Sequence, residues 1–231
     1  MSSNITQDGW DFGGTREDQE EYIRLISYLE TSFRAPAIVC ILAASNQPDL
    51  VKSFIQHAIT VDGGTNPLQL VQLCRASLIK AIPICGVPKV INAMSKVVDS
   101  LPQYLQDQLA DSYKPPPTLS PEAYHDRGLA LFNRVYGSNS QRVQDNLYKG
   151  NPLLKELAVD VMYGRILSDE SLISASQTEL LNIGILVTQD VPPQLRGHLA
   201  GARNVGVPQV EVDAMISLAK LFMRQRHGEG V

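Results

Sequence analysis

Residues 178–215 read TELLNIGILVTQDVPPQLRGHLAGARNVGVPQVEVDAM, and this stretch decides the fold class. Its first part is an apolar segment of helical length that ends in a polar turn around Asp190. Pro192 and Pro193 stand where a second helix begins, a position at which the missing backbone donor costs nothing. Gly206 separates that helix from a third. The stretch therefore predicts helices in succession, joined by short turns.

Apolar residues recur at helical spacing along the rest of the chain as well, and strand-like alternation is nearly absent. Of the 231 residues, 44% are hydrophobic but only 6% are aromatic, so Leu, Ile, Val and Ala must fill the core, as helix packing favours. The sequence predicts an all-α fold. The first expected helix begins near Arg16. The other helices are expected at 36–46, 49–61, 67–85, 89–101, 121–136, 139–148, 152–165, 171–188, 192–205 and 208–226.

A run of three prolines, Pro115 to Pro117, divides the chain, because successive prolines favour extended geometry and cannot donate hydrogen bonds. We predict a flexible leader at 1–16, a first helical half at 17–110, a proline-rich linker at 111–121 and a second helical half at 122–226.

Charge and composition exclude several classes of partner. The formal net charge is −4 without a basic patch, so neither nucleic acid nor an anionic membrane is expected to bind. No apolar run is as long as a membrane helix requires, and the polar, acidic N-terminal stretch lacks a signal sequence, so a cytoplasmic location is expected. Cys40, Cys74 and Cys85 form neither a CxxC pair nor zinc spacing, and we expect buried free thiols and no bound metal.

Three stretches of the second half carry a family resemblance: RGLALFNRVYG (127–137), NPLLKELAVDVMYGRILSDESL (151–172) and the stretch at 178–215. Together they make residues 127–222 similar to the carboxymuconolactone decarboxylase family, which includes the alkylhydroperoxidase D proteins. The positions that match the family pattern in the last stretch are Leu195, His198, Ala202, Gly206, Val207 and Glu211.

The first half resembles the same family less well, through Cys85-Gly86-Val87-Pro88 and Asn92-Ala93-Met94. The resemblance implies a helical alkylhydroperoxidase D-like fold made of two fused similar halves, of which the first is degenerate. It also implies that the halves pack against each other as protomers do in single-domain relatives, and that the protein is a homo-oligomer.

The peroxidase branch of the family uses a Glu, two cysteines in a CxxC motif and a His. The interval from Glu179 to His198 equals the interval between that Glu and that His, but Val191 and Gln194 stand where the two thiols would be. Since a dithiol peroxidase needs one thiolate to attack and a second to resolve, thiol peroxidase activity is not expected.

The resemblance then leaves a carboxylate and an imidazole as candidate catalytic residues, Glu179 and His198. A Glu beside a His in an apolar pocket can transfer protons, as decarboxylation or isomerisation of a small carboxylate or lactone requires. Arg196 is the candidate to bind a substrate carboxylate, Tyr163 and Asn204 are candidates to line the pocket, and no cofactor is implied.

A second hypothesis remains open from the residues alone. The decarboxylase branch has a Ser where Glu179 stands and an Arg where Thr178 stands, and the first half is degenerate. The chain is therefore either an acid/base enzyme or a non-catalytic, oligomeric helical scaffold that retains the fold. A cavity of ligand size beside Glu179 and His198 would favour the enzyme.

Overall fold

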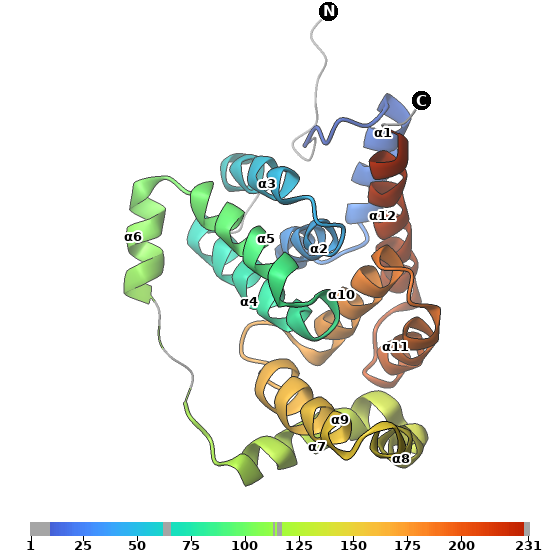
Figure 1. Cartoon of the computed structure of the whole chain (residues 1–231). Helices are drawn as coiled ribbons and strands as arrows, with labels where there is room; N and C mark the ends of the chain where they lie inside the picture. Colours follow the sequence, from blue (N-terminus) through green and yellow to red (C-terminus); the bar gives the residue numbers. More distant parts are fainter. Residues whose placement is uncertain (1–9, 62–65, 113, 115–116, 229–231) are drawn as a thin grey trace, which may run out of the picture.

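The computed structural model describes residues 10–61, 66–112, 114 and 117–228, and this part of the chain contains helices and no strand, as the sequence predicts. Figure 1 shows their arrangement. The helices are α1 (Arg16–Ile26), α2 (Thr31–Ala44), α3 (Pro48–Val61), α4 (Pro67–Cys85), α5 (Val87–Asp99), α6 (Gln103–Ser112), α7 (Pro121–Tyr136), η1 (Gly137–Asn139), α8 (Ser140–Gly150), α9 (Pro152–Glu156), η2 (Leu157–Leu167), α10 (Ala175–Thr188), α11 (Pro192–Asn204) and α12 (Gln209–Gly228).

The centre of the molecule is made by α2 and α10, which pack against each other. Both are apolar around their whole circumference and almost completely buried, as a helix that is covered on all sides must be. Further helices from both halves, α4, α5 and α12, add their apolar faces to the same core. Residues from both predicted halves therefore share one main core.

A smaller apolar cluster lies between α7 and η2. These two helices approach closely because each contributes a glycine to the contact. A Cβ on Gly128 would collide with the carbonyl oxygen of Val159, and a Cβ on Gly164 would collide with the carbonyl oxygen of Tyr124. In Figure 1, α7, α8 and α9 lie together in a layer beside α10 and α11.

One predicted helix, 152–165, differs from a regular α-helix. After one α-helical turn the segment Leu157–Leu167 is a π-helix, in which the backbone N–H of Ser168 donates to the carbonyl of Tyr163 at 2.9 Å. Such i→i+5 segments are rare and occur often at functional sites. The apolar pattern of the sequence does not distinguish this winding from an α-helix, so it was not predicted.

Most other boundaries agree with the prediction within a few residues, and α7 agrees at both ends. The helix α6 was not predicted at all, and among the predicted helices the start of α2 differs most, since it begins at Thr31 and not at Pro36. Pro36 lies inside the helix, where the flanking apolar residues are buried in the core and compensate for the missing hydrogen bond.

The prediction of a flexible leader is wrong for the residues that the structure describes before α1. Trp10 and Phe12 are 3% and 5% exposed, and their rings contact Tyr22, Phe54 and Phe222. Few apolar residues occur in this stretch, but two aromatic side chains bury enough surface to hold it on the core. Residues 1–9 of the leader, and Tyr113, Pro115 and Pro116 of the predicted linker, lie outside the described residues.

The two halves share one local structure. The turns after α2 and α10 both place a non-glycine residue at positive φ, Asn46 at 56° and Asp190 at 52°. Equivalent backbone bonds follow, Gln47 N–H to Leu42 and Val191 N–H to Leu186, at 2.9 and 3.1 Å. The fused-copy organisation itself stays a prediction, because α4 lies between α3 and α5 whereas α12 follows α11 directly.

Within the described ranges, α4 is the helix that is long and apolar enough to cross a membrane by length and composition alone, contrary to the expectation from the sequence. Half of the tested window is buried inside the protein, and α4 packs along α2. Core helices of soluble proteins pass the same test, so α4 is weak evidence for a membrane span.

Candidate active site

Glu179 and His198 are in contact, as the interval between them predicts. Glu179 lies in the first turns of α10 and is 2% exposed, and one of its carboxylate oxygens, Oε2, lies 2.9 Å from Nδ1 of His198 on α11. The other oxygen, Oε1, accepts a hydrogen bond of 3.1 Å from the amide of Asn182, one turn further along α10. Both oxygens of this buried carboxylate are therefore paired, as burial of a charged group requires.

A glycine makes room for this carboxylate. Gly201 follows His198 by one turn of α11, and a Cβ placed there would lie 2.7 Å from Oε2 of Glu179 and 2.8 Å from Val135. These distances are shorter than a side chain tolerates, so the bond between Glu179 and His198 depends on the missing side chain at position 201.

His198 lines a cavity of about 460 Å³, within the range of small-molecule sites, and Glu179 lies behind it, outside the lining. Its wall combines the second half with the C-terminal end of α4 from the first half. From the π-helix, residues four or five apart face the cavity, because that spacing places them on one side of its wide turns. The lining residues are Pro83, Ile84, Phe132, Tyr136, Val143, Asn146, Leu147, Ala158, Met162, Tyr163, Leu167, Asn182, Pro193, Gln194, Gly197 and His198.

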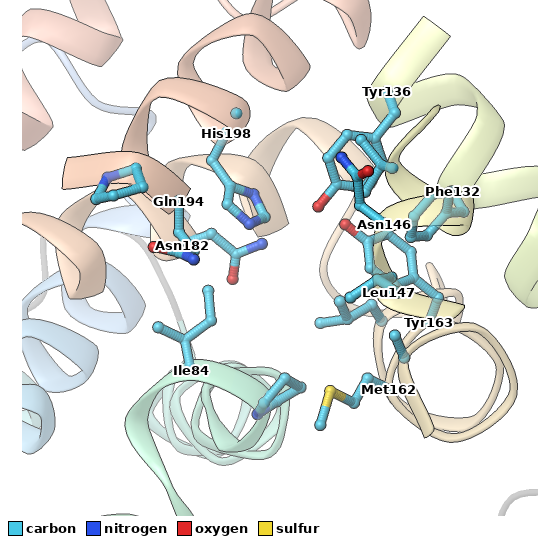
Figure 2. A pocket seen from close by; sticks show the side chains of 16 residues that line it. Ile84, Phe132, Tyr136, Asn146, Leu147, Met162, Tyr163, Asn182, Gln194 and His198 are labelled. Atoms are coloured by element: carbon cyan, nitrogen blue, oxygen red, sulfur yellow. The ribbon is translucent and has the colours of Figure 1, made fainter. Parts of the chain in front are cut away.

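Two tyrosines face His198 across this cavity. Figure 2 shows the hydroxyl groups of Tyr136 and Tyr163 directed from one wall toward the opposite wall, where His198, Asn182 and Gln194 lie. Burial raises the pKa of Tyr136, and it raises the pKa of Tyr163 well above its ordinary value. Both phenols therefore stay protonated at neutral pH and are available as hydrogen-bond donors.

One buried polar atom of the wall, Oδ1 of Asn182, has no hydrogen-bond partner among the described residues. An unpaired buried polar atom costs roughly 1–3 kcal/mol, so such atoms are uncommon in a packed interior. The position of Asn182 in the cavity wall indicates a site that a hydrogen-bond donor of a ligand completes.

The other predicted site residues divide into three cases. Tyr163 lines the cavity, as predicted. Arg196 is exposed and lines a second, adjoining cavity of about 310 Å³. Asn204 lines neither cavity, because its amide donates to the carbonyl of Val135 at 2.8 Å, near the end of α7. The substrate-binding role of Asn204 stays a prediction, which its place outside both cavities and its capping contact with α7 do not favour.

Sequence reasoning missed Tyr136 and Asn182. Tyr136 lies in the stretch 127–137, next to a glycine with φ of 52°, but nothing local indicates what its side chain faces. Asn182 carried a usable signal, since it is a polar residue in an apolar helix one turn after Glu179.

The positions that hold thiols in the peroxidase branch have no sulfur here. Val191 precedes α11, and Gln194 lines the cavity. All three cysteines are free and buried elsewhere in the core. Burial raises the pKa of Cys74 and of Cys85, and burial together with the two neighbouring thiols raises the pKa of Cys40. A thiolate is thus disfavoured at all three.

The described residues contain no group of three His, Cys, Asp or Glu side chains that could hold a metal ion.

Sequence comparison shows that the part of the chain with the candidate site is similar to known proteins. A model of the carboxymuconolactone decarboxylase family matches residues 152–222, which include η2, α10 and α11 and thus both members of the Glu179–His198 pair. "Peroxisomal protein 2" of Schizosaccharomyces pombe is 32% identical over 187 residues, which cover 79% of this chain and 82% of the relative.

The chain belongs to the carboxymuconolactone decarboxylase family. Its all-α fold is of the alkylhydroperoxidase D type that this membership implies. "Peroxisomal protein 2" of Saccharomyces cerevisiae is also 32% identical, over 174 residues that cover 67% of this chain and 62% of the relative, so the chain spans less than two thirds of that protein. No solved structure matches the chain.

Proposed function

We propose that this member of the family is an acid/base enzyme that moves a proton at a carbon atom beside a carbonyl group, in a small carboxylate or lactone. One observation carries the proposal: His198, whose Nδ1 lies 2.9 Å from a carboxylate oxygen of the buried Glu179, lines a cavity of ligand size. A packed, filled site would have favoured the scaffold hypothesis.

Glu179 acts as a positioning residue for the imidazole. When the neutral ring donates its Nδ1–H to the carboxylate, the lone pair stays on Nε2, which is the nitrogen left for the substrate. The carboxylate also stabilises the imidazolium that forms when His198 accepts a proton. Asn182 holds the other carboxylate oxygen, so the acceptor remains directed at His198.

Tyr136 and Tyr163 complete the proposed chemistry from the opposite wall. In an isomerisation, Nε2 of His198 removes the proton from carbon, the C–H electron pair forms a C=C bond, and the π pair of the carbonyl moves onto its oxygen. The phenols donate hydrogen bonds to the resulting enolate. The imidazolium then returns the proton to a different carbon. In a decarboxylation, the bond between carbon and the carboxylate breaks, CO₂ leaves, and the electron pair of that bond remains in the same kind of enolate. His198, having taken a proton from solvent, then protonates the enolate carbon. Donors placed in advance at a developing oxyanion are a large source of catalysis.

The scaffold hypothesis has one specific observation in its favour. Where the hairpin α10–α11 carries Glu179 and His198, the matching positions of α2–α3, counted from Asn46 and Asp190, hold Ala35 and Phe54. Phe54 packs against Trp10 with ring centroids 5.0 Å apart, so the first hairpin keeps its shape with an apolar interior. An apolar hairpin with the same turn geometry supports the hypothesis that such a hairpin forms without the Glu–His pair.

The names of the two relatives bear on location. Both are called peroxisomal proteins, so we propose that this chain works in peroxisomes and not in the cytoplasm, which was the expectation from the sequence. A fluorescent fusion of the full chain should coincide with a peroxisomal marker. Diffuse fluorescence throughout the cytoplasm would contradict this location.

The catalytic proposal is tested by proton exchange, which reports proton transfer at carbon whatever the final product is. A panel of β-keto acids and unsaturated lactones is incubated with the protein in deuterated water, and deuterium uptake at carbon is followed by NMR. We expect uptake with the native protein and a loss of at least about a hundredfold with His198→Gln, since general acid/base groups contribute on the order of 10²–10⁴ in rate.

His125→Gln is the matched control, because His125 also pairs with a carboxylate, Asp160, at 2.7 Å, but lies outside the cavity. It should leave exchange unchanged. Equal exchange by native protein and His198→Gln, with both folded by circular dichroism, would exclude the catalytic role and leave the scaffold hypothesis.

A further inference from the structure

The second cavity adjoins the first on the side of α8. Its volume is about 310 Å³, and it shares Tyr136, Val143, Pro193 and Gly197 with the cavity that contains His198. Because four residues line both spaces, the two cavities are neighbours, and the second is the adjacent space for a ligand longer than the first. Tyr136 stands at the junction.

The charges in the two walls are all of one sign. Among the described lining residues, the charged side chains are Arg142 on α8 and Arg196 on α11, and both line the second cavity. Neither guanidinium has an ion-pair partner within the described residues, and no Asp, Glu or Lys lines either cavity. Two unpaired arginines from different helices thus converge on one space in a protein whose net charge is −4.

The first cavity has the opposite character. Its wall is mainly apolar and includes Ile84, Phe132, Leu147 and Met162. The polar lining residues are His198, the two tyrosines, Asn146, Asn182 and Gln194. Such a wall favours the apolar body of a ligand, whereas a guanidinium favours a carboxylate or phosphate, to which it can donate two parallel hydrogen bonds.

We propose that the substrate is an amphipathic oxyanion, in which a carboxylate or phosphate head is bound by Arg142 and Arg196 and an apolar body extends into the cavity beside His198. This substrate class rests on the proposed function. In the bound substrate, the reacting carbonyl group lies between the anionic head and the apolar body, beside Tyr136, which lines both cavities. The bound anion is then the part of the substrate that does not react.

Other ligand classes fit the two walls less well. A cation would meet two arginines without any acidic residue in the lining, and a sugar would leave its hydroxyl groups against the apolar wall. A neutral hydrocarbon would fill the first cavity but would leave the arginines unused. The combination of one apolar space and one cationic space therefore selects a ligand with both parts.

Binding is measured by calorimetry with unreactive probes, decanoate, decyl phosphate, decanol and acetate, each below its micelle concentration. We expect decanoate or decyl phosphate to bind at least about tenfold more tightly than decanol, because a charge-assisted hydrogen bond contributes about that factor. Acetate, which has the head without the body, should bind weakly. The tighter of the two anions identifies the head as carboxylate or phosphate.

The double variant Arg142→Gln, Arg196→Gln should lose the preference for the anion over decanol while its affinity for decanol stays the same. Arg203→Gln is the matched control, since Arg203 is an exposed arginine on the same helix, α11, and lines neither cavity. Met162→Gln, which makes the apolar wall polar at similar side-chain length, should weaken decanoate and decanol alike. Decanol binding as tightly as the anions, or equal losses in the double variant and in Arg203→Gln, would overturn the proposal.

The outcome is separable from that of the catalytic proposal, because the probes do not react. His198→Gln should bind decanoate as the native protein does. If His198→Gln leaves proton exchange intact while the arginine variants lose anion binding, the catalytic role fails and the substrate class stands. If the arginines have no effect on binding but His198→Gln abolishes exchange, the substrate class fails alone.

Discussion

At the scale of single residues, the contact between Glu179 and His198 depends on what is missing at position 201. A helix offers each residue neighbours one turn away, and Gly201 occupies that place beside His198 on α11. The carboxylate of Glu179 fills the space that a Cβ would occupy there. Gly201, which has no side chain, thus leaves the room in which the carboxylate of Glu179 contacts the imidazole of His198.

Gly201→Ala should therefore displace the Glu179 carboxylate, weaken its bond to His198 and lower proton exchange by about tenfold or more. The same crowding should reduce the free energy of unfolding by roughly 1–3 kcal/mol, as overpacked cores do. Urea denaturation measures the second effect. Gly197→Ala is the control for stability, because a Cβ there meets only Tyr136 at 3.9 Å, an ordinary contact. Equal stabilities of the two variants would contradict the crowding.

At the scale of helices, a buried lysine connects the two halves. Lys80 on α4 is 4% exposed, and its ammonium group donates to the carbonyl of Leu167, the last residue of η2, at 2.6 Å. The contact satisfies a carbonyl at the C-terminal end of the π-helix, where a positive charge is also favoured by the helix dipole. Burial nevertheless disfavours the charge, and it lowers the pKa of Lys80 to about 8.

This lowered pKa predicts a direction for stability against pH. Below pH about 8 both the folded and the unfolded chain carry the proton, so the cost of burying the charge is present in full. Between pH about 8 and the ordinary lysine pKa of about 10.4, the unfolded chain binds the proton and the folded chain releases it, so stability rises with pH.

Lys80→Met isolates this effect, since it removes the titrating group and keeps a long side chain. The unfolding free energy of the native protein minus that of the variant should increase by up to roughly 3 kcal/mol as the pH rises through this window. Urea denaturation at several pH values measures the difference. A difference that stays constant, or falls, would show that Lys80 keeps its proton in the folded protein.

At the scale of the whole molecule, the surface leaves apolar side chains exposed close together in sequence. Tyr148, Leu153, Leu154, Leu157 and Val161, on α8, α9 and η2, are 38–57% exposed. Grouped exposed apolar residues of this kind mark surfaces that bind other proteins, and closed homo-oligomers are the commonest way to cover them. We therefore keep the prediction that the chain forms a homo-oligomer, with this surface as its contact.

Sedimentation at micromolar concentration should then give a mass above 25.4 kDa, the mass of one chain. The double variant Leu153→Ser, Leu157→Ser should shift the population toward the monomer, because it removes apolar area from the contact. Ile91→Ser on α5, where the side chain is 57% exposed on a different helix, should leave the mass unchanged. A native protein that sediments as a single chain would exclude the oligomer.

The same scale shows where prediction from the sequence succeeded. Helix positions follow from apolar spacing and from caps such as Asn66, whose side chain accepts a hydrogen bond from Leu68 N–H in the structure. These are interactions between neighbours in the chain, so the sequence contains them directly. The meeting of Glu179 and His198 was predicted from the family resemblance, because the interval between them equals the interval between the Glu and the His of the peroxidase branch.

Only the tertiary structure decided the rest. The cavity combines residues of α4, α7, α8, η2, α10 and α11, and no spacing along the chain relates Tyr136 to His198 or Arg142 to Arg196. Asn204 and Trp10 show the same limit, since one faces away from the cavity and the other is buried by helices distant in sequence. Local periodicity determines which face of a helix is apolar. Long-range packing determines which other helices contact that face. The candidate site lies where faces of several helices come together, so its composition depends on that packing.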